Sequence, residues 1–221
     1  MIDLTDLVDL RAFLRRLDKA AAELLDERDR YGHQDLGNMQ PWMGPRYGLP
    51  GRKEPLSIFR GEGMLLFLLA RILKPAVIAE CYTGTGYAAV CLAAGAPEAR
   101  VLSVDNYTEG GAGKDGFLIA TTLRDRLALV NLELIMGSIG DLNERMIGDG
   151  VDLYLSDGPY GQSPRLKAHA TVVRHDTDDG QIPSRTFKVI GGSRMSVMCS
   201  TVEQRDRLAV DIGRVMPVGL P

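Results

Sequence analysis

Five polar residues follow short apolar runs, at positions where parallel strands would end. Glu80 and Asp105 each close a run typical of a buried strand, and Ser138, Asp157 and His175 follow three later runs of the same kind. In open α/β sheets, ligands bind at the carboxyl ends of the strands, near the point where the strand order reverses. The pattern therefore predicts one site that gathers carboxylates, a hydroxyl and an imidazole.

A tight turn, Tyr82-Thr83-Gly84-Thr85-Gly86, joins the first of these strands to a helix. Gly84 and Gly86 allow the backbone to turn sharply and to approach a ligand closely. Strand, glycine turn and helix begin a βαβ unit that binds a nucleotide-like ligand, and Asp105 at the next strand end would accept both hydroxyls of a ribose. A dinucleotide site needs a third glycine that this turn lacks, which disfavours NAD.

The turn, the two acids and the later strand ends Gly137-Ser138 and Ser156-Asp157-Gly158 together resemble class I S-adenosylmethionine (SAM) dependent methyltransferases of the small-molecule O-methyltransferase type. That family usually has acid-x-Gly-x-Gly-x-Gly here, whereas this chain has Tyr82 at the first Gly. The resemblance implies SAM as the cofactor. The cofactor-binding residues that it implies are Glu80, Tyr82, Gly84, Gly86, Asp105, Asn106, Ser138, Ile139 and Asp157.

These residues have separate expected roles. Glu80 would orient the amino group of SAM through the loop backbone, or alternatively would only cap the turn. Asp105 is assigned to the ribose, and Asn106 would border the adenine. Ser138 and Ile139 resemble the position that brackets the adenine edge, with Ser138 also a helix N-cap.

Four residues are candidate catalytic groups: Asp157, Tyr160, His175 and Tyr82. His175 is a candidate general base because the unperturbed pKa of histidine lies near neutrality. The alternative for His175 is a strand histidine satisfied in the core. Tyr160 is the second candidate base, and Asp157 would lie near the methionine amino group or the acceptor. Tyr82 adds bulk towards the methionine half of the site.

A metal site is the less favoured expectation. Mg²⁺ prefers several oxygen ligands, and Asp157, Asp176 and Asp178 would supply three. Relatives with firm metal sites usually have Asp-Asn at strand five, whereas Thr177 follows Asp176 here.

Alternating strands and helices predict an α/β fold: a Rossmann-like, seven-stranded, mostly parallel sheet with helices on both faces and a helical N-terminal lid. The expected strands are 76–81, 100–105, 132–137, 151–156, 170–175, 187–190 and 195–200, the last two forming a terminal hairpin. The expected helices are 4–31, 56–74, 86–95, 114–129, 139–147 and 202–213, and the last eight residues are expected to form a tail.

Two parts are expected: residues 1–60, an N-terminal helix and lid segment, and residues 61–221, the SAM-binding Rossmann-like domain. The apolar stripe of helix 4–31 must cover either the core or a second subunit, and a packing helix is favoured. Segment 32–55 is rich in Pro and Gly, holds the only Trp, and is interpreted as a lid over the SAM site.

Composition narrows the function classes. A net charge of −3 and a pI near 5.7 argue against nucleic-acid binding. There is no apolar run long enough to span a membrane. The three cysteines lack ligand spacing and are expected to be buried thiols, which favours a cytoplasmic location. A homodimer and a small-molecule substrate are the expected partners.

The connections after strands four and five, residues 158–170 and 177–186, are too short for full covering helices. An acceptor pocket would then come mostly from the first 60 residues. The favoured function is methyl transfer to a small-molecule hydroxyl or amine, as in small-molecule biosynthesis. The alternative is a SAM-consuming cyclase or lyase that releases methylthioadenosine and an azetidine or cyclopropane carboxylate. A non-catalytic SAM-binding protein is the third hypothesis.

Overall fold

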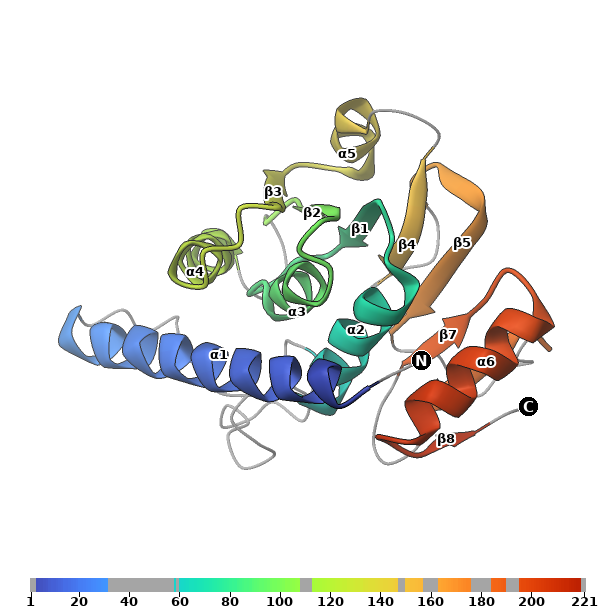
Figure 1. Ribbon diagram of the computed structural model, residues 1–221. Coiled ribbons are helices and arrows are strands. Elements are labelled where there is room, and N and C mark those ends of the chain that lie inside the picture. Colours follow the sequence, from blue (N-terminus) through green and yellow to red (C-terminus); the bar gives the residue numbers. More distant parts are fainter. Residues whose placement is uncertain are drawn as a thin grey trace, which may run out of the picture.

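The computed structural model describes residues 3–31, 58, 60–107, 113–146, 150–156, 163–175, 184–189 and 195–219. The helices in this part of the chain are α1 (Leu4–Tyr31), α2 (Arg60–Leu73), α3 (Tyr87–Gly95), α4 (Gly113–Arg126), α5 (Ile139–Arg145) and α6 (Val202–Gly213) (Figure 1). The strands are β1 (Val77–Cys81), β2 (Arg100–Asp105), β3 (Leu132–Met136), β4 (Val151–Ser156), β5 (Leu166–Arg174), β6 (Thr186–Val189), β7 (Ser196–Met198) and β8 (Val218–Gly219). The expected lid segment, 32–55, lies outside the described residues.

One sheet holds all these strands in the order β3-β2-β1-β4-β5-β7-β6-β8. Strands β1 to β5 pair in parallel, and β7 lies antiparallel between β5 and β6. The predicted fold class and the terminal hairpin are confirmed. The predicted C-terminal tail is wrong, because Val218 pairs with Val189 and makes β8 a short extra edge strand. The strand order reverses between β1 and β4, which marks the carboxyl end of β1 as the expected ligand position.

The parallel strands are apolar on both faces because both faces are packed. Ile78 of β1 contributes to a first core shared with α1, α2, α3, α4 and α6, and the next residue, Ala79, contributes to a second core under α5. Figure 1 shows α5 apart from the other five helices. Alternation along each strand therefore decides which core a side chain enters. The second core consists of Ala79, Cys81, Leu102, Val104, Ile135, Leu142, Met146, Val151, Tyr154 and Val172.

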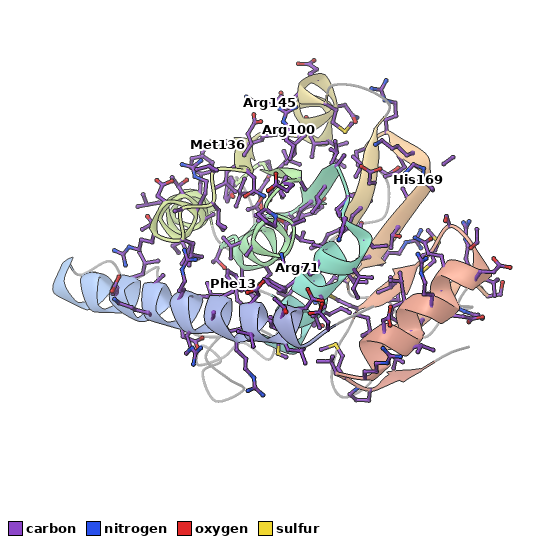
Figure 2. All side chains as sticks on the ribbon, in the orientation of Figure 1. Phe13, Arg71, Arg100, Met136, Arg145 and His169 are labelled. Carbon is purple, nitrogen blue, oxygen red and sulfur yellow. The ribbon has the colours of Figure 1, made fainter. Side chains whose placement is uncertain are left out.

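Most of the apolar side chains described for α1 are buried against the rest of the chain. Leu10, Phe13 and Leu17 are each at most 6% exposed. Phe13 stacks on Phe67 of α2 with ring centroids 5.5 Å apart, and Arg71 of α2 pairs with Asp6 and Asp9 of α1 (Figure 2). Full burial of each such apolar side chain contributes about 1.5–3 kcal/mol. The packing-helix interpretation of α1 therefore accounts for its apolar face. Among the residues described, no helix is long and apolar enough to cross a membrane.

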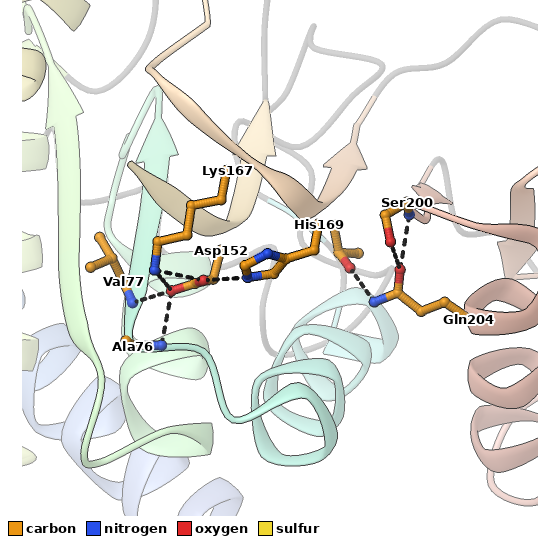
Figure 3. Close-up of polar contacts among 8 residues, drawn as sticks. Ala76, Val77, Asp152, Lys167, His169, Ser200 and Gln204 are labelled. Atoms are coloured by element: carbon orange, nitrogen blue, oxygen red, sulfur yellow. Dashed lines mark hydrogen bonds and ion pairs between the residues drawn. The ribbon is translucent and has the colours of Figure 1, made fainter. Parts of the chain in front are cut away.

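Strand β5 begins at Leu166, earlier than the predicted residue 170, and its pairing with β4 is irregular opposite Asp152. Val151 pairs with Leu166 but Leu153 pairs with Thr171, so residues 167–170 bulge out of the ladder. The Asp152 carboxylate accepts hydrogen bonds from the backbone N–H groups of Ala76 and Val77, at 3.0 and 2.9 Å. Lys167 and His169 of the bulge also contact it, at 2.9 and 3.1 Å (Figure 3). This carboxylate joins β1, β4 and β5 at the amino ends of the strands, opposite the expected site.

Asp152→Asn is expected to destabilise the fold near neutral pH by about 1 kcal/mol, which lowers Tm by about 2–4 °C. Burial alone would raise the pKa of Asp152, but hydrogen bonds from Lys167, Val77 and His169 outweigh it and hold the pKa below its usual value. A lowered folded pKa stabilises above the unfolded value, near pH 4, and this contribution is lost as pH falls through the folded value. Melting curves from pH 7 to 3 should show the gap between variant and wild type closing below about pH 4. The exposed Glu98→Gln is the control, and a gap that stays constant with pH would contradict the argument.

Candidate functional site

A cavity of about 390 Å³ opens at the carboxyl ends of β1 to β4. Its size lies within the range of small-molecule pockets. It lies on the side of the sheet that α5 covers, because its strand residues Cys81, Val104 and Tyr154 belong to the second core. The lining residues are Cys81, Tyr82, Val104, Asp105, Asn106, Gly137, Ser138, Ile139, Tyr154 and Ser156.

The structure brings together five of the residues singled out from the sequence: Tyr82, Asp105, Asn106, Ser138 and Ile139 all line the cavity. Three others, Glu80, Gly84 and Gly86, lie in or behind the turn and shape it. Asp157, Tyr160, Asp176 and Asp178 lie outside the described residues, and their roles stay predictions. In the described part of the chain, no cluster of three His, Cys, Asp or Glu side chains is placed to hold a metal ion.

Asp105 fixes the turn that borders the cavity. One carboxylate oxygen accepts the backbone N–H of Gly84 and the other accepts that of Tyr107, both at 2.9 Å. The backbone N–H of Tyr82 donates to the carbonyl of Val104 at 2.8 Å, which ties the turn to β2 a second time. An ionised carboxylate has about four acceptor positions, so two remain for a ligand after these bonds. Asp105 therefore both shapes the turn and presents an anion to the cavity.

Glu80 acts from behind the turn. Its side chain is 1% exposed and accepts a hydrogen bond of 2.5 Å from the Ser103 hydroxyl, which lies 2.6 Å from the Thr83 hydroxyl. Glu80 does not line the cavity, so any effect on a ligand passes through Ser103, Thr83 and the loop backbone.

Tyr82 has a backbone conformation that favours glycine. Its φ is +70°, and Gly84 and Gly86 follow with φ of +54° and +83°. A non-glycine residue in this left-handed region costs about 1–2 kcal/mol. The Tyr82 side chain is 46% exposed and lines the cavity. Backbone strain of this kind persists where surrounding structure imposes it, most often at functional sites.

Comparing Tyr82→Gly with Tyr82→Ala separates the backbone strain from the phenol. Both variants remove the ring, but only glycine relieves the positive φ, so Tyr82→Gly should melt about 2–4 °C above Tyr82→Ala. Both should change ligand affinity by the same factor, since that factor reports the lost ring. Calorimetry for melting and titration for affinity check this. Equal melting temperatures for the two variants would show that the turn relaxes once the ring is gone.

Ser138 and Ile139 form the wall between β3 and α5. The Asp141 carboxylate accepts both the backbone N–H and the hydroxyl of Ser138, at 2.7 and 2.8 Å. These bonds hold the pKa of Asp141 below its usual value. Ile139 packs against the second core. The wall thus has a hydrogen-bonded polar end at Ser138 and an apolar end at Ile139.

Cys81 and Tyr154, which form the floor of the cavity, were not predicted from the sequence. Cys81 and Tyr154 come from neighbouring strands and lie within hydrogen-bonding reach of each other. Burial raises the pKa of the Cys81 thiol to about 11 and that of Tyr154 above its usual value. Both groups are therefore neutral at pH 7, and the floor is polar but uncharged. Their pairing depends on the register Ala79 with Tyr154 and Cys81 with Ser156, which a linear pattern does not reveal.

His175 lies in the core. Its side chain is 3% exposed, and its Nε2 atom lies 3.3 Å from Oε2 of the equally buried Glu62 in α2. It is not among the residues that line the cavity. A general base must reach the proton that it removes, so this placement favours the core interpretation of His175.

No protein-family model matches the chain, and no curated protein matches it in sequence. Solved structures do share its fold. A methyltransferase from Geobacter sulfurreducens has 18% identity over 64% of this chain and 78% of that one, with a TM-score of 0.52. The O-methyltransferase TomG from Streptomyces achromogenes, which takes part in tomaymycin synthesis and was solved with SAM, has 17% identity over 84% of this chain and 90% of that one, with a TM-score of 0.54. The chain therefore has the Rossmann-like fold found in these methyltransferases.

Proposed function

We propose that the protein is a SAM-dependent methyltransferase that acts on a hydroxyl or amine of a small molecule. The observation that carries the proposal is the cavity at the strand ends, where Asp105 faces a wall formed by Ser138 and Ile139. In an open α/β sheet this is the position for a nucleoside-containing ligand. The shared fold with the methyltransferase solved in complex with SAM supports the same ligand.

The residues of the cavity fit SAM. In this proposal Asp105 would accept the two ribose hydroxyls, and Asn106, Ser138 and Ile139, which also line the cavity, would border the adenine. Tyr82 would border the methionine part. When bound, SAM supplies an electrophilic methyl group on a sulfonium sulfur.

This chain's own contribution is binding, orientation and the exclusion of water. Holding two reactants in line accounts for much of the acceleration in such reactions. Cys81 and Tyr154, which line the cavity, are neutral and would present no thiolate or phenolate to a bound sulfonium. Asp157 and Tyr160 stay candidates for the acceptor side. A cytoplasmic homodimer serving small-molecule biosynthesis is the setting we propose, and light scattering on the purified protein tests the dimer.

The position of Tyr82 favours a second candidate function. Tyr82 has a left-handed backbone conformation and lines the cavity, and its phenol would narrow the space for the methionine part of SAM. A folded methionine chain would then suit an internal reaction of SAM that releases methylthioadenosine and a cyclic amino acid, without an acceptor.

Mass spectrometry of the products distinguishes the candidates. The purified protein is incubated with SAM alone and with a panel of small hydroxyl and amine acceptors. S-adenosylhomocysteine that forms only with an acceptor supports methyl transfer. Methylthioadenosine formed with SAM alone, above a no-enzyme control, replaces that proposal with the internal reaction. Tight SAM binding without turnover would point to a SAM-binding protein that does no catalysis.

A further inference from the structure

Glu62 and His175 form a buried pair that the proposed chemistry does not use. The two side chains are 1% and 3% exposed, and Oε2 of Glu62 lies 3.3 Å from Nε2 of His175. Burying two ionisable groups costs desolvation, and an apolar pair of similar volume is often as stable or more stable. The pair is therefore poorly explained by stability alone.

His175, which follows β5, connects the pair to the cavity through one backbone hydrogen bond. The backbone N–H of His175 donates to the carbonyl of Ser156 at 3.0 Å. Ser156 ends β4, lines the cavity and is paired in register with Cys81. The position of His175 thus bears directly on the β4 end of the cavity.

Glu62 connects the pair to the glycine turn through the packing of α2. Glu62 precedes Gly63, where an added Cβ would lie only 2.8 Å from Cε1 of Tyr87 and 3.0 Å from Sγ of Cys91. Tyr87 is the first residue of α3 and follows Gly86 of the turn. The first turn of α2 therefore packs directly on Tyr87, the residue that follows the glycine turn.

We propose that Glu62 and His175 are positioning residues, which join α2 to the end of β5 and so hold the turn 82–87 and the end of β4 in register. These two segments flank the half of the cavity assigned to methionine. Neither side chain lines the cavity, so neither is a catalytic residue in this proposal. The effect on SAM rests on the proposed function, whereas the effect on the turn rests on the contacts alone.

The double variant Glu62→Leu/His175→Leu tests this because it removes the polar contact and keeps the space filled. The expected result is a variant that stays folded by circular dichroism, with a SAM Kd at least about tenfold weaker by calorimetry. Amide hydrogen exchange at Gly84 and Gly86 should be at least about tenfold faster, since local opening of the turn becomes easier.

A second variant, His175→Asn, tests the proposal if the double variant does not fold. His175→Asn is too short to reach Glu62 but keeps a polar group. Its control is Asp152→Asn, which also loses a polar contact but lies at the opposite, amino ends of the strands. SAM binding is measured well below the melting temperatures of the two variants. His175→Asn should weaken SAM binding at least about fivefold, whereas Asp152→Asn should leave the Kd unchanged.

Unchanged affinity and unchanged exchange in the folded variants would overturn the positioning role. A wild-type protein that does not bind SAM would instead overturn the proposed function. In that case the exchange rates of Gly84 and Gly86 still decide whether the pair holds the turn.

Discussion

Asp105→Ala is expected to abolish SAM binding, raising the Kd at least about 100-fold. Two charge-assisted hydrogen bonds to the ribose, each contributing about 1.5–3 kcal/mol, would be lost. The same change also frees the backbone N–H groups of Gly84 and Tyr107, which Asp105 now accepts at 2.9 Å. The turn therefore loses one of its anchors to β2 when the ligand loses its partner. Isothermal titration with SAM measures the effect, and circular dichroism shows whether the fold remains.

Two controls sharpen the result for Asp105. Glu133 lies in the neighbouring strand β3, pairs with Arg100 and Arg145, and does not line the cavity. Glu133→Gln removes this acid. It should leave the Kd for SAM unchanged. Asp105→Asn keeps the shape and one acceptor oxygen, and should lose less affinity than the alanine variant. Retained affinity in Asp105→Ala would show that the ligand site lies elsewhere.

The features that the sequence predicted correctly depend on residues close together in the chain. Glu80, Asp105 and Ser138 each follow an apolar run, and strand ends are marked within a few residues of the chain. The roles of Gly84 and Gly86 follow the same logic, since both have the positive φ that a tight turn requires. The fold class followed from the alternation of strands and helices, because parallel strands need crossover helices.

What the sequence did not predict depends on register and on long-range packing. Tyr154 enters the cavity floor because Ala79 is its partner in the sheet, a pairing that no local pattern encodes. The contact of His175 with Glu62 joins residues far apart in the chain and depends on how α2 packs. The strand Val218–Gly219 has too few residues for a periodic signal and forms because β6 presents an open edge.

Tyr82 lies between these two cases. The sequence shows a tyrosine in the turn, but its φ of +70° was visible only in the structure. Tyr82 is 46% exposed and lines the cavity, so this residue contributes both backbone strain and a phenol to the site.

Gly86→Ala is expected to be among the most damaging single changes in the domain. Gly86 has φ of +83°, and an added Cβ would lie 2.6 Å from Cβ and 2.9 Å from Cα of Ala120 in α4. Left-handed strain of about 1–2 kcal/mol and overpacking of about 1–3 kcal/mol add together. The free energy of unfolding should fall by about 2–5 kcal/mol, which lowers Tm by about 4–20 °C. SAM affinity should fall as well, because Gly86 ends the turn.

A double-mutant cycle with Ala120→Gly separates the two causes. Glycine at 120 costs about 1 kcal/mol in the interior of α4, but it removes the Cβ that the new methyl group meets. The double variant should therefore lose at least about 1 kcal/mol less than the sum of the single variants. Gly61→Ala, in α2 with nothing within 4 Å of the added Cβ, is the matched control and should stabilise the protein. Strict additivity of Gly86→Ala and Ala120→Gly would mean that α3 and α4 separate freely and that the backbone conformation of Gly86 alone sets the cost.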